Sequence, residues 1–198
     1  MYDVVIVGAG AAGFGCALTL ASANDKFEWA KDKTYLMFDN NKSDLNAAKY
    51  CNVAGVDFGI NGVELLEKMK KQLSNFKACQ LKNDTVTKIE KSDNIFKVTA
   101  QNETVEAKIV VLATGFHKFE IKCEGVEVKA NDNAPKPNLI YIENKNNLIK
   151  ENLYVAGLAS KVPTMLSVAS GDGAKVACDI FKQWSGKVAV VHDFASKK

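Results

Sequence analysis

The feature that most constrains this chain is a glycine motif between a short apolar segment and a helix-like segment. Residues 2–7 form a nearly continuous apolar run rich in β-branched residues, which predicts a parallel strand buried on both faces. Gly8-Ala9-Gly10-Ala11-Ala12-Gly13 follows, and residues 14–23 are rich in alanine and leucine, which predicts a helix. A glycine-rich turn from strand to helix lets a backbone hold the pyrophosphate of a dinucleotide.

Each glycine of the motif has a distinct expected role. Gly8 permits the tight turn, Gly10 lets a pyrophosphate approach the backbone, and Gly13 lets the helix pack close to the strand. The start of the helix then offers free N–H groups to the phosphates. We expect Gly8, Gly10 and Gly13, with Ala9, Ala11 and Ala12 between them, to bind a dinucleotide; the alternative for the motif alone is an ordinary glycine-rich turn.

A second strand is expected over residues 34–38, and it ends at Asp39. A carboxylate at this point can accept hydrogen bonds from the ribose hydroxyls of an adenosine, and it repels a 2′-phosphate. Asp39 lies 26 residues after Gly13, somewhat more than the roughly 20 that are typical of this motif. We place Asp39 and the neighbouring Asn40 in the site. The alternative is a surface aspartate that begins a turn with Asn40 and Asn41.

The remaining pattern predicts an α/β fold of the Rossmann-like, dinucleotide-binding type, with a parallel sheet and a small antiparallel β-meander in one domain over residues 1–198. Apolar residues at helical spacing predict a helix that begins after Asn61, with Glu64 at the position of the capping partner. The meander is expected from strands at residues 78–81, 85–91, 95–100 and 103–107. Further strands are expected at 109–113, 139–142 and 153–156. The last helix is expected at 174–184, opened by residues 170–173. The tail, residues 188–198, is expected to add an edge strand and a disordered end.

Composition excludes several classes of partner. The 26 basic residues, all of them lysine, nearly balance the 23 acidic ones, so neither nucleic acid nor an anionic membrane is an expected partner. Without arginine, the chain has no bidentate guanidinium site for the 2′-phosphate of NADP. The five cysteines lack CxxC spacing, which argues against a disulfide framework and a metal site. No apolar run is long enough to span a membrane, and we expect a cytoplasmic protein.

Four segments, in order, resemble the FAD domain of low-molecular-weight thioredoxin reductases and related pyridine nucleotide–disulfide oxidoreductases. They are residues 4–20 with the glycine motif, residues 52–66 with Asn-Val-Ala-Gly and Gly-Ile-Asn-Gly-Val-Glu-Leu-Leu, residues 85–115 ending in Ala-Thr-Gly, and residues 152–174 with Val-Ala-Gly and Ala-Ser-Gly-Asp-Gly. The resemblance implies that FAD, rather than NAD, is the dinucleotide. It also leaves a homodimer through this domain open.

The resemblance carries roles onto individual positions. It implies that Val86 presents its backbone to the adenine and that Asn52 belongs to the FAD site. Residues Ala113, Thr114 and Gly115 would pass close to FAD, and Gly157 and the start of the last helix, including Ser167, would lie by the ribityl chain and the isoalloxazine ring.

Three departures from the family pattern stand out. The family carries an NAD(P)H-binding domain between the segments that end at Gly115 and begin at Leu153, whereas residues 116–150 here are a short replacement without a second glycine motif or a CxxC. Leu158 stands where the family has an aspartate that hydrogen-bonds the ribityl chain. Leu166 stands where the family has a glutamine, so the flavin end of the site is expected to be apolar.

The sequence leaves three functions open, of which the third is a Rossmann-like protein that has lost its cofactor and serves as a structural partner. The first is a small FAD-dependent oxidoreductase that takes electrons from a partner protein or from transiently bound NADH. The second is a non-catalytic module that binds FAD or another dinucleotide as a sensor, carrier or subunit, which the absent carboxylate at Leu158 favours. Cys51 and His117 are the weak catalytic candidates, as a redox thiol and a proton-transfer group, with a small buried residue and a solvated histidine as the alternatives.

Overall fold

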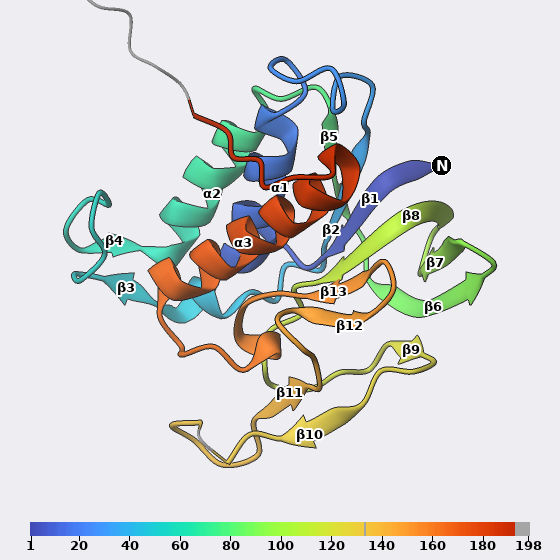
Figure 1. The fold of residues 1–198 in the computed structure, drawn as a ribbon. Coiled ribbons are helices and arrows are strands. Elements are labelled where there is room, and N and C mark those ends of the chain that lie inside the picture. The colour runs from blue at the N-terminus through green and yellow to red at the C-terminus, as the bar shows by residue number, and fades with distance from the viewer. Residues whose placement is uncertain (133, 193–198) are drawn as a thin grey trace, which may run out of the picture.

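Five parallel strands form the centre of the fold, in the order β5–β2–β1–β8–β13. The computed structural model describes residues 1–132 and 134–192 of the chain, shown as a ribbon in Figure 1. The central strands are β1 (Tyr2–Val7), β2 (Tyr35–Asp39), β5 (Cys79–Asn83), β8 (Thr104–Leu112) and β13 (Leu153–Val155). Because all the pairs are parallel, the carboxyl ends of these strands meet at one edge of the sheet, where α/β proteins bind their ligands.

Two sequence predictions for this region are corrected. The strand predicted at 78–81 is β5, which pairs in parallel with β2 and is therefore no part of the antiparallel meander. The strands predicted at 103–107 and 109–113 are one strand, β8, whose first half pairs with β7 and whose second half pairs with β1. The long strand thus carries the chain out of the meander and into the parallel sheet.

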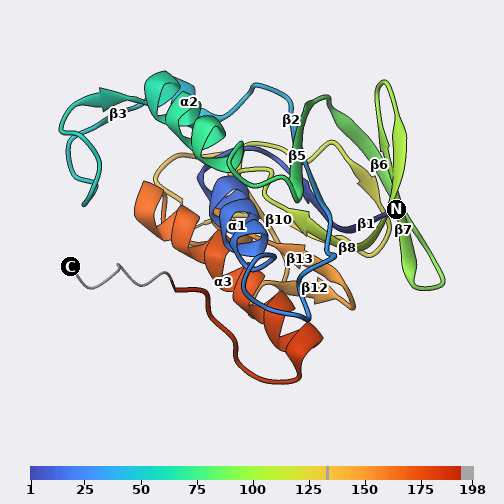
Figure 2. The same cartoon turned by 90° about the horizontal axis from the view of Figure 1, so that it is seen from above.

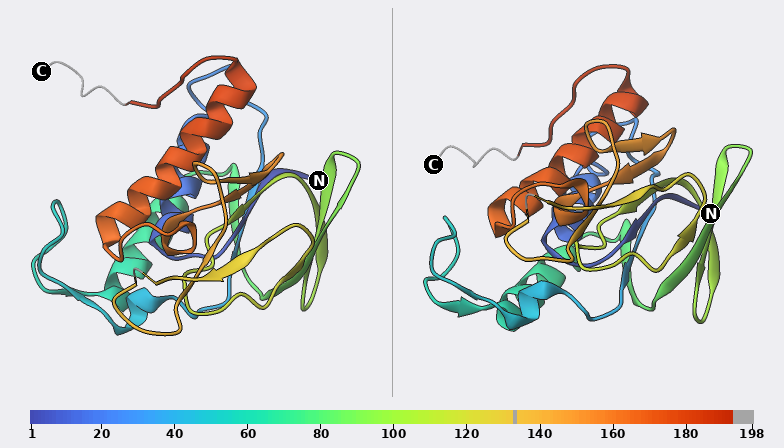
Figure 3. Two further views of the ribbon diagram at one scale, coloured as in Figure 1. Left: turned by 60° about the horizontal axis from the view of Figure 1, so that its bottom comes forward. Right: turned by 90° about the horizontal axis from the view of Figure 1, so that it is seen from below.

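The meander consists of β6 (Val86–Ser92) and β7 (Ile95–Ala100) with the first half of β8, as predicted. A short strand, β9 (Lys122–Cys123), extends it by pairing with β6. Figure 3 shows the β6–β7 hairpin standing on the opposite side of the parallel strands from the long helices. Its buried side chains pack with the sheet residues that point away from those helices, in a core that includes Val5, Phe38, Phe96 and Val110.

The helices α1 (Ala11–Ser22) and α3 (Leu166–Ser185) lie side by side on the other face of the sheet, as Figures 1 and 2 show. Alternation along the strands sends Val4, Ile6 and Val111 toward the helices and their neighbours toward the meander, so that the sheet separates two cores. The helices approach closely because a Cβ at Gly15 would overlap the carbonyl oxygen of Ser170, and one at Gly173 would overlap that of Ala12.

The last helix begins earlier than the sequence predicted. It starts at Leu166 rather than at residue 174, so Gly171 and Gly173 lie inside α3 instead of opening it. At Gly173 the missing side chain is needed for contact with α1, and this packing offsets the low helix propensity of glycine. Residues 188–192 form no strand, which corrects the prediction of an edge strand there, and the rest of the tail lies outside the described residues.

The connections between these layers are short elements. Between β2 and β5 the chain forms the 3-10 turn η1 (Asp44–Ala47), the hairpin β3 (Lys49–Tyr50) and β4 (Ile60–Asn61), and the helix α2 (Gly62–Leu73). The predicted cap is confirmed, because Asn61 Oδ1 accepts from the Glu64 N–H at 2.8 Å. After β8 come β10 (Val128–Ala130), β11 (Ile140–Ile142), β12 (Leu148–Lys150) and, following β13, the 3-10 turn η2 (Gly157–Ser160).

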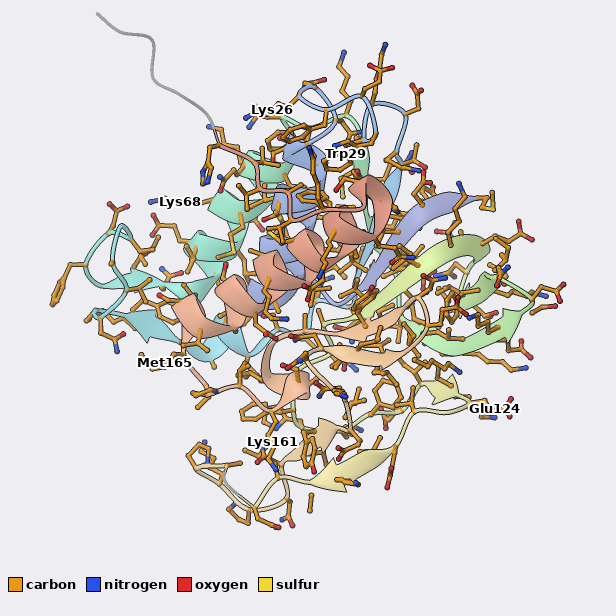
Figure 4. All side chains as sticks on the ribbon, viewed as in Figure 1. Lys26, Trp29, Lys68, Glu124, Lys161 and Met165 are labelled. Atoms are coloured by element: carbon orange, nitrogen blue, oxygen red, sulfur yellow. The ribbon has the colours of Figure 1, made fainter. Side chains whose placement is uncertain are left out.

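Lys161, labelled in Figure 4, links the end of η2 to β11. Its Nζ lies 4.3 Å from the centroid of the Tyr141 ring, a cation–π contact. Within the described residues, no helix is long and apolar enough to cross a membrane.

Two glycines of α3 provide a matched test of the close helix contact. Gly173→Ala should destabilise the protein by about 1–3 kcal/mol, because its Cβ would overlap backbone of α1. Gly171→Ala should stabilise it by about 0.5–1 kcal/mol, since its Cβ meets no described atom within 4 Å and alanine favours a helix. Urea unfolding followed by circular dichroism measures both, and equal effects would contradict the packing described.

Candidate dinucleotide-binding site

One cavity of about 540 Å³ opens at the carboxyl edge of the parallel strands. Its walls come from the glycine loop after β1, the segments after β2 and β8, the β5–β6 connection, and the start of α3. The predicted site residues that line it are Gly8, Ala9, Gly10, Ala11, Ala12, Asp39, Asn40, Val86, Ala113, Thr114, Gly115, His117, Leu158 and Leu166. Residues far apart in the sequence are therefore brought to one place, and the volume lies within the range of small-molecule sites.

The three motif glycines are placed as their expected roles require. Gly8 has a φ of +112°, and a Cβ there would overlap the Ala113 carbonyl oxygen, so the turn passes directly against the end of β8. A Cβ at Gly13 would overlap the Gly8 carbonyl oxygen, which fixes α1 against the loop. Gly10 faces the open cavity, since its Cβ would meet only Ser43 Oγ, at 3.4 Å.

The N-terminus of α1 is left free to bind an anion. Gly10 is the N-cap, no side chain among the described residues caps the helix, and its first turn contains no acidic residue. The N–H groups of this first turn are unpaired within the helix, and the helix dipole places partial positive charge there. These features together suit the pyrophosphate of a dinucleotide.

The end of the cavity that follows β2 is polar, and two aspartates there accept hydrogen bonds from backbone N–H groups. Asp39, only 7% exposed, accepts a hydrogen bond from the Asn41 N–H at 2.8 Å, and its second oxygen lies 3.7 Å from Lys70 Nζ. Asp84 accepts from the Thr85 N–H at 2.7 Å and from the Asn102 N–H at 3.1 Å. Burial would raise the pKa of Asp84, but these bonds outweigh it and hold the pKa below its ordinary value.

Asp84 was missed from the sequence, although a signal for it was present. It directly follows β5, at the same sheet edge as Asp39, and its N–H bonds to the Asp39 carbonyl at 3.0 Å. Residues 78–81 were expected to belong to the antiparallel meander. Only a strand that runs parallel to β2 has its carboxyl end beside that of β2, so this expectation did not place Asp84 near Asp39. The Asp84 hydrogen bonds order the backbone that leads into Val86, the residue whose backbone is expected to meet the adenine.

The opposite end of the cavity is apolar. Ala156, Leu158, Leu166 and Ala169 line it, together with Met165, which immediately precedes α3 and is labelled in Figure 4. Thr114 lies between the two ends, and its buried hydroxyl has no hydrogen-bond partner among the described residues. A buried hydroxyl left without a partner is costly, so a polar ligand atom at this point would stabilise it.

The mouth of the cavity carries a contact that the sequence did not predict. His117 Nε2 lies 2.9 Å from Asp44 Oδ1, and both residues line the cavity. Asp44 follows β2 and His117 follows β8, and β1 with its glycine loop lies between these strands. The pair therefore joins the segments on either side of the glycine loop.

Several sequence candidates lie off the cavity wall. Cys51 and Asn52 are exposed on the β3–β4 hairpin, and Ser167 is exposed in the first turn of α3. Gly157, with a φ of +73°, lies behind the wall, where a Cβ would come within 2.5 Å of Ala12 Cβ. Gly13 likewise supports the loop from behind. The position of Cys51 corrects its interpretation as a small buried residue.

No cysteine of the described residues lines the cavity. Cys16 and Cys79 are buried, and burial raises the pKa of both thiols, to about 12 for Cys79. Thiols with raised pKa values stay protonated at neutral pH and are poor nucleophiles.

Comparison with known proteins identifies the family of this site. Residues 2–157 match the sequence profile described as pyridine nucleotide-disulphide oxidoreductase. The chain belongs to the pyridine nucleotide-disulphide oxidoreductase family. Its thioredoxin reductases and ferredoxin–NADP reductases are FAD-binding flavoproteins, in agreement with the cofactor and the Rossmann-like fold class expected from the sequence.

Individual relatives agree with this assignment. A thioredoxin reductase of Treponema pallidum is 36% identical over 118 residues, which cover 58% of this chain and 35% of the relative. A ferredoxin–NADP reductase of Leuconostoc citreum is 29% identical over 177 residues, 84% of this chain and 50% of the relative. The chain thus spans half or less of the length of these two curated relatives.

The fold is that of a solved thioredoxin reductase from Gloeobacter violaceus. The two structures superpose with a TM-score of 0.74 at 17% identity, over 98% of this chain and 99% of the other. At this identity the likeness concerns the fold alone.

Asp84 allows a test of the adenosine end of the cavity. Asp84→Ala should weaken ADP binding at least several-fold, since the residues leading to Val86 lose their hydrogen-bond acceptor. Its lowered pKa means that the carboxylate stabilises this connection above the ordinary aspartate pKa and ceases to do so as the pH falls through the lowered value. Calorimetric titration with ADP measures the effect. Asp32→Ala, an exposed aspartate between α1 and β2, is the control, and an equal loss in both variants would contradict the assignment.

Proposed function

We propose that this chain is an FAD-binding domain and acts as a small FAD-dependent oxidoreductase. The observation that carries the proposal is the free N-terminus of α1, which faces the cavity at Gly10. One end of the cavity holds the buried Asp39 carboxylate, and the other end has an apolar wall. A molecule with adenosine, pyrophosphate and a planar ring system matches this order of polar, anionic and apolar contacts.

Each part of the cavity has a proposed role toward FAD. Gly8 to Ala12, supported from behind by Gly13, hold the pyrophosphate, Asp39 and Asn40 the adenosine ribose, and the backbone at Val86 the adenine. Ala113, Thr114 and Gly115 pass along the middle of the cofactor, and Leu158 and Leu166 face its ring end. The bound flavin would supply the redox chemistry, and the protein its position and surroundings.

The electron donor is proposed to come from outside this domain. Residues 116–150, which include β9 to β12, stand where relatives are expected to carry an NAD(P)H-binding domain, and they leave the cavity open at its mouth. Reducing equivalents would then come from a partner protein or from NADH that docks transiently. The proposed proton-transfer group between solvent and a bound ligand is His117, which contacts Asp44 and lines the cavity.

A second candidate function is a non-catalytic FAD or dinucleotide module. Leu158 favours it, because an apolar side chain replaces the carboxylate that the family resemblance would place at the ribityl chain. Anaerobic stopped-flow mixing separates the two functions. Bleaching of the bound flavin by NADH or by a reduced ferredoxin-like protein within seconds supports the enzyme, and a bound flavin inert to both supports the module.

Two further expectations stay predictions. A homodimer formed through this domain is one, and sedimentation analysis of the purified protein tests it. A reducing, cytoplasmic location is the other, for which five free cysteines are the supporting observation.

Gly10 tests the phosphate contact. Gly10→Leu should reduce FAD binding by more than about a hundredfold, because the side chain would project into the cavity beside the start of α1. Titration of cofactor-free protein with FAD, followed by flavin fluorescence, measures the loss. Gly171→Leu places the same side chain on an open face of α3 and is the control. FAD affinity unchanged by Gly10→Leu would overturn the assignment of this loop.

A further inference from the structure

We propose that Asp172 is a positioning residue that sets the shape of the flavin end of the cavity from behind. The proposal rests on the proposed FAD site. Asp172 lies in α3, half-buried, and is absent from the cavity wall. Its carboxylate accepts hydrogen bonds from three residues, two of them in η2 and the third immediately before β12.

Two of these bonds hold the two ends of η2. The Gly157 N–H donates to Asp172 Oδ2 at 2.7 Å, and Ser160 Oγ donates to the same oxygen at 2.7 Å. Leu158 lies between these anchors and lines the cavity. Fixing Gly157 and Ser160 therefore fixes where the Leu158 side chain faces the ligand.

The third donor is Asn147, which is 5% exposed. Its side-chain amide donates to both Asp172 oxygens, at 3.0 and 2.9 Å, and also to the Val155 carbonyl at 3.0 Å. Its own side-chain oxygen accepts from Lys175 Nζ at 3.0 Å. The network thus ties α3 to the last residue of β13, immediately before the turn that forms the cavity wall.

Backbone packing explains why this turn needs a support from α3. Gly157 has a φ of +73° and lies against Ala12, and Gly173 lies against the carbonyl of Ala12. The turn and α3 therefore contact the same residue of the pyrophosphate-binding helix. A shift of η2 would change the distance between the pyrophosphate loop and Leu158, which is the distance that a bound flavin must span.

The carboxylate of Asp172 therefore acts on this turn from behind the cavity wall. Where relatives are expected to present an aspartate to the ribityl chain, this protein has Leu158 on the wall and a carboxylate behind it. Asp172 orders the backbone instead of touching the ligand. Its loss should affect the flavin half of the cofactor and spare the adenosine half.

The test compares FAD and ADP as probes of the two halves. Asp172→Asn keeps the size of the side chain but replaces one acceptor oxygen with a donor. We expect its FAD affinity to fall at least about tenfold while its ADP affinity changes less than about twofold, both by calorimetry. The visible circular dichroism of bound FAD should also change. Asp32→Asn alters an exposed carboxylate between α1 and β2, outside this network, and it should leave both affinities and the spectrum unchanged.

Ser160→Ala provides a second variant should Asp172→Asn fail to fold. It removes one donor at the end of η2 and should lower FAD affinity in the same selective manner, by a smaller factor. Equal losses of FAD and ADP affinity, or no loss of either, in the folded variants would overturn the role of Asp172. Folded wild-type protein that binds ADP but no FAD would overturn the proposed function itself.

Discussion

The close approach of backbone to backbone around Ala12 is the constraint on which the rest of the structure depends. Gly8, Gly13 and Gly173 each lie where a Cβ would overlap a carbonyl oxygen, and together they bring the glycine loop, β8, α1 and α3 into direct contact. These contacts leave the first turn of α1 uncapped at the carboxyl edge of the sheet. The same packing that closes the core therefore creates the anion-binding end of a helix.

The cavity changes character along its length, and each part follows from an element of the fold. The polar end follows β2 and β5, where Asp39 and Asp84 are linked through the backbone. The apolar end is formed by η2 and the start of α3, where Leu158 and Leu166 line the wall. This gradient would hold the adenosine by hydrogen bonds and leave the ring end in apolar surroundings, where desolvation strengthens nearby electrostatic interactions.

Much of this could be predicted from the sequence, and the errors have physical causes. The glycine motif, Asp39 and the cap at Asn61 were predicted because they depend on local geometry that residue types encode. The parallel pairing of β5 was missed because a short amphipathic strand reads alike in either sheet. The early start of α3 was missed because glycines normally interrupt a helix, whereas here Gly173 is needed for the close contact with Ala12. Asp84 was missed together with the parallel pairing of β5, whereas Asp44 and Asp172 depend on contacts between distant segments, which spacing along the chain does not reveal.

The absorption spectrum of freshly purified protein, with chromatography of the nucleotide that heat releases, tests the central claim most directly. The account predicts flavin bands and release of FAD in near-stoichiometric amount, since the free start of α1, the unpartnered Thr114 hydroxyl and the buried Asp39 together suit that cofactor. A folded, colourless protein that fails to take up added FAD would contradict it. That result would mean that the protein, with Leu158 in place of a carboxylate, has a dinucleotide-binding fold but a function other than FAD binding.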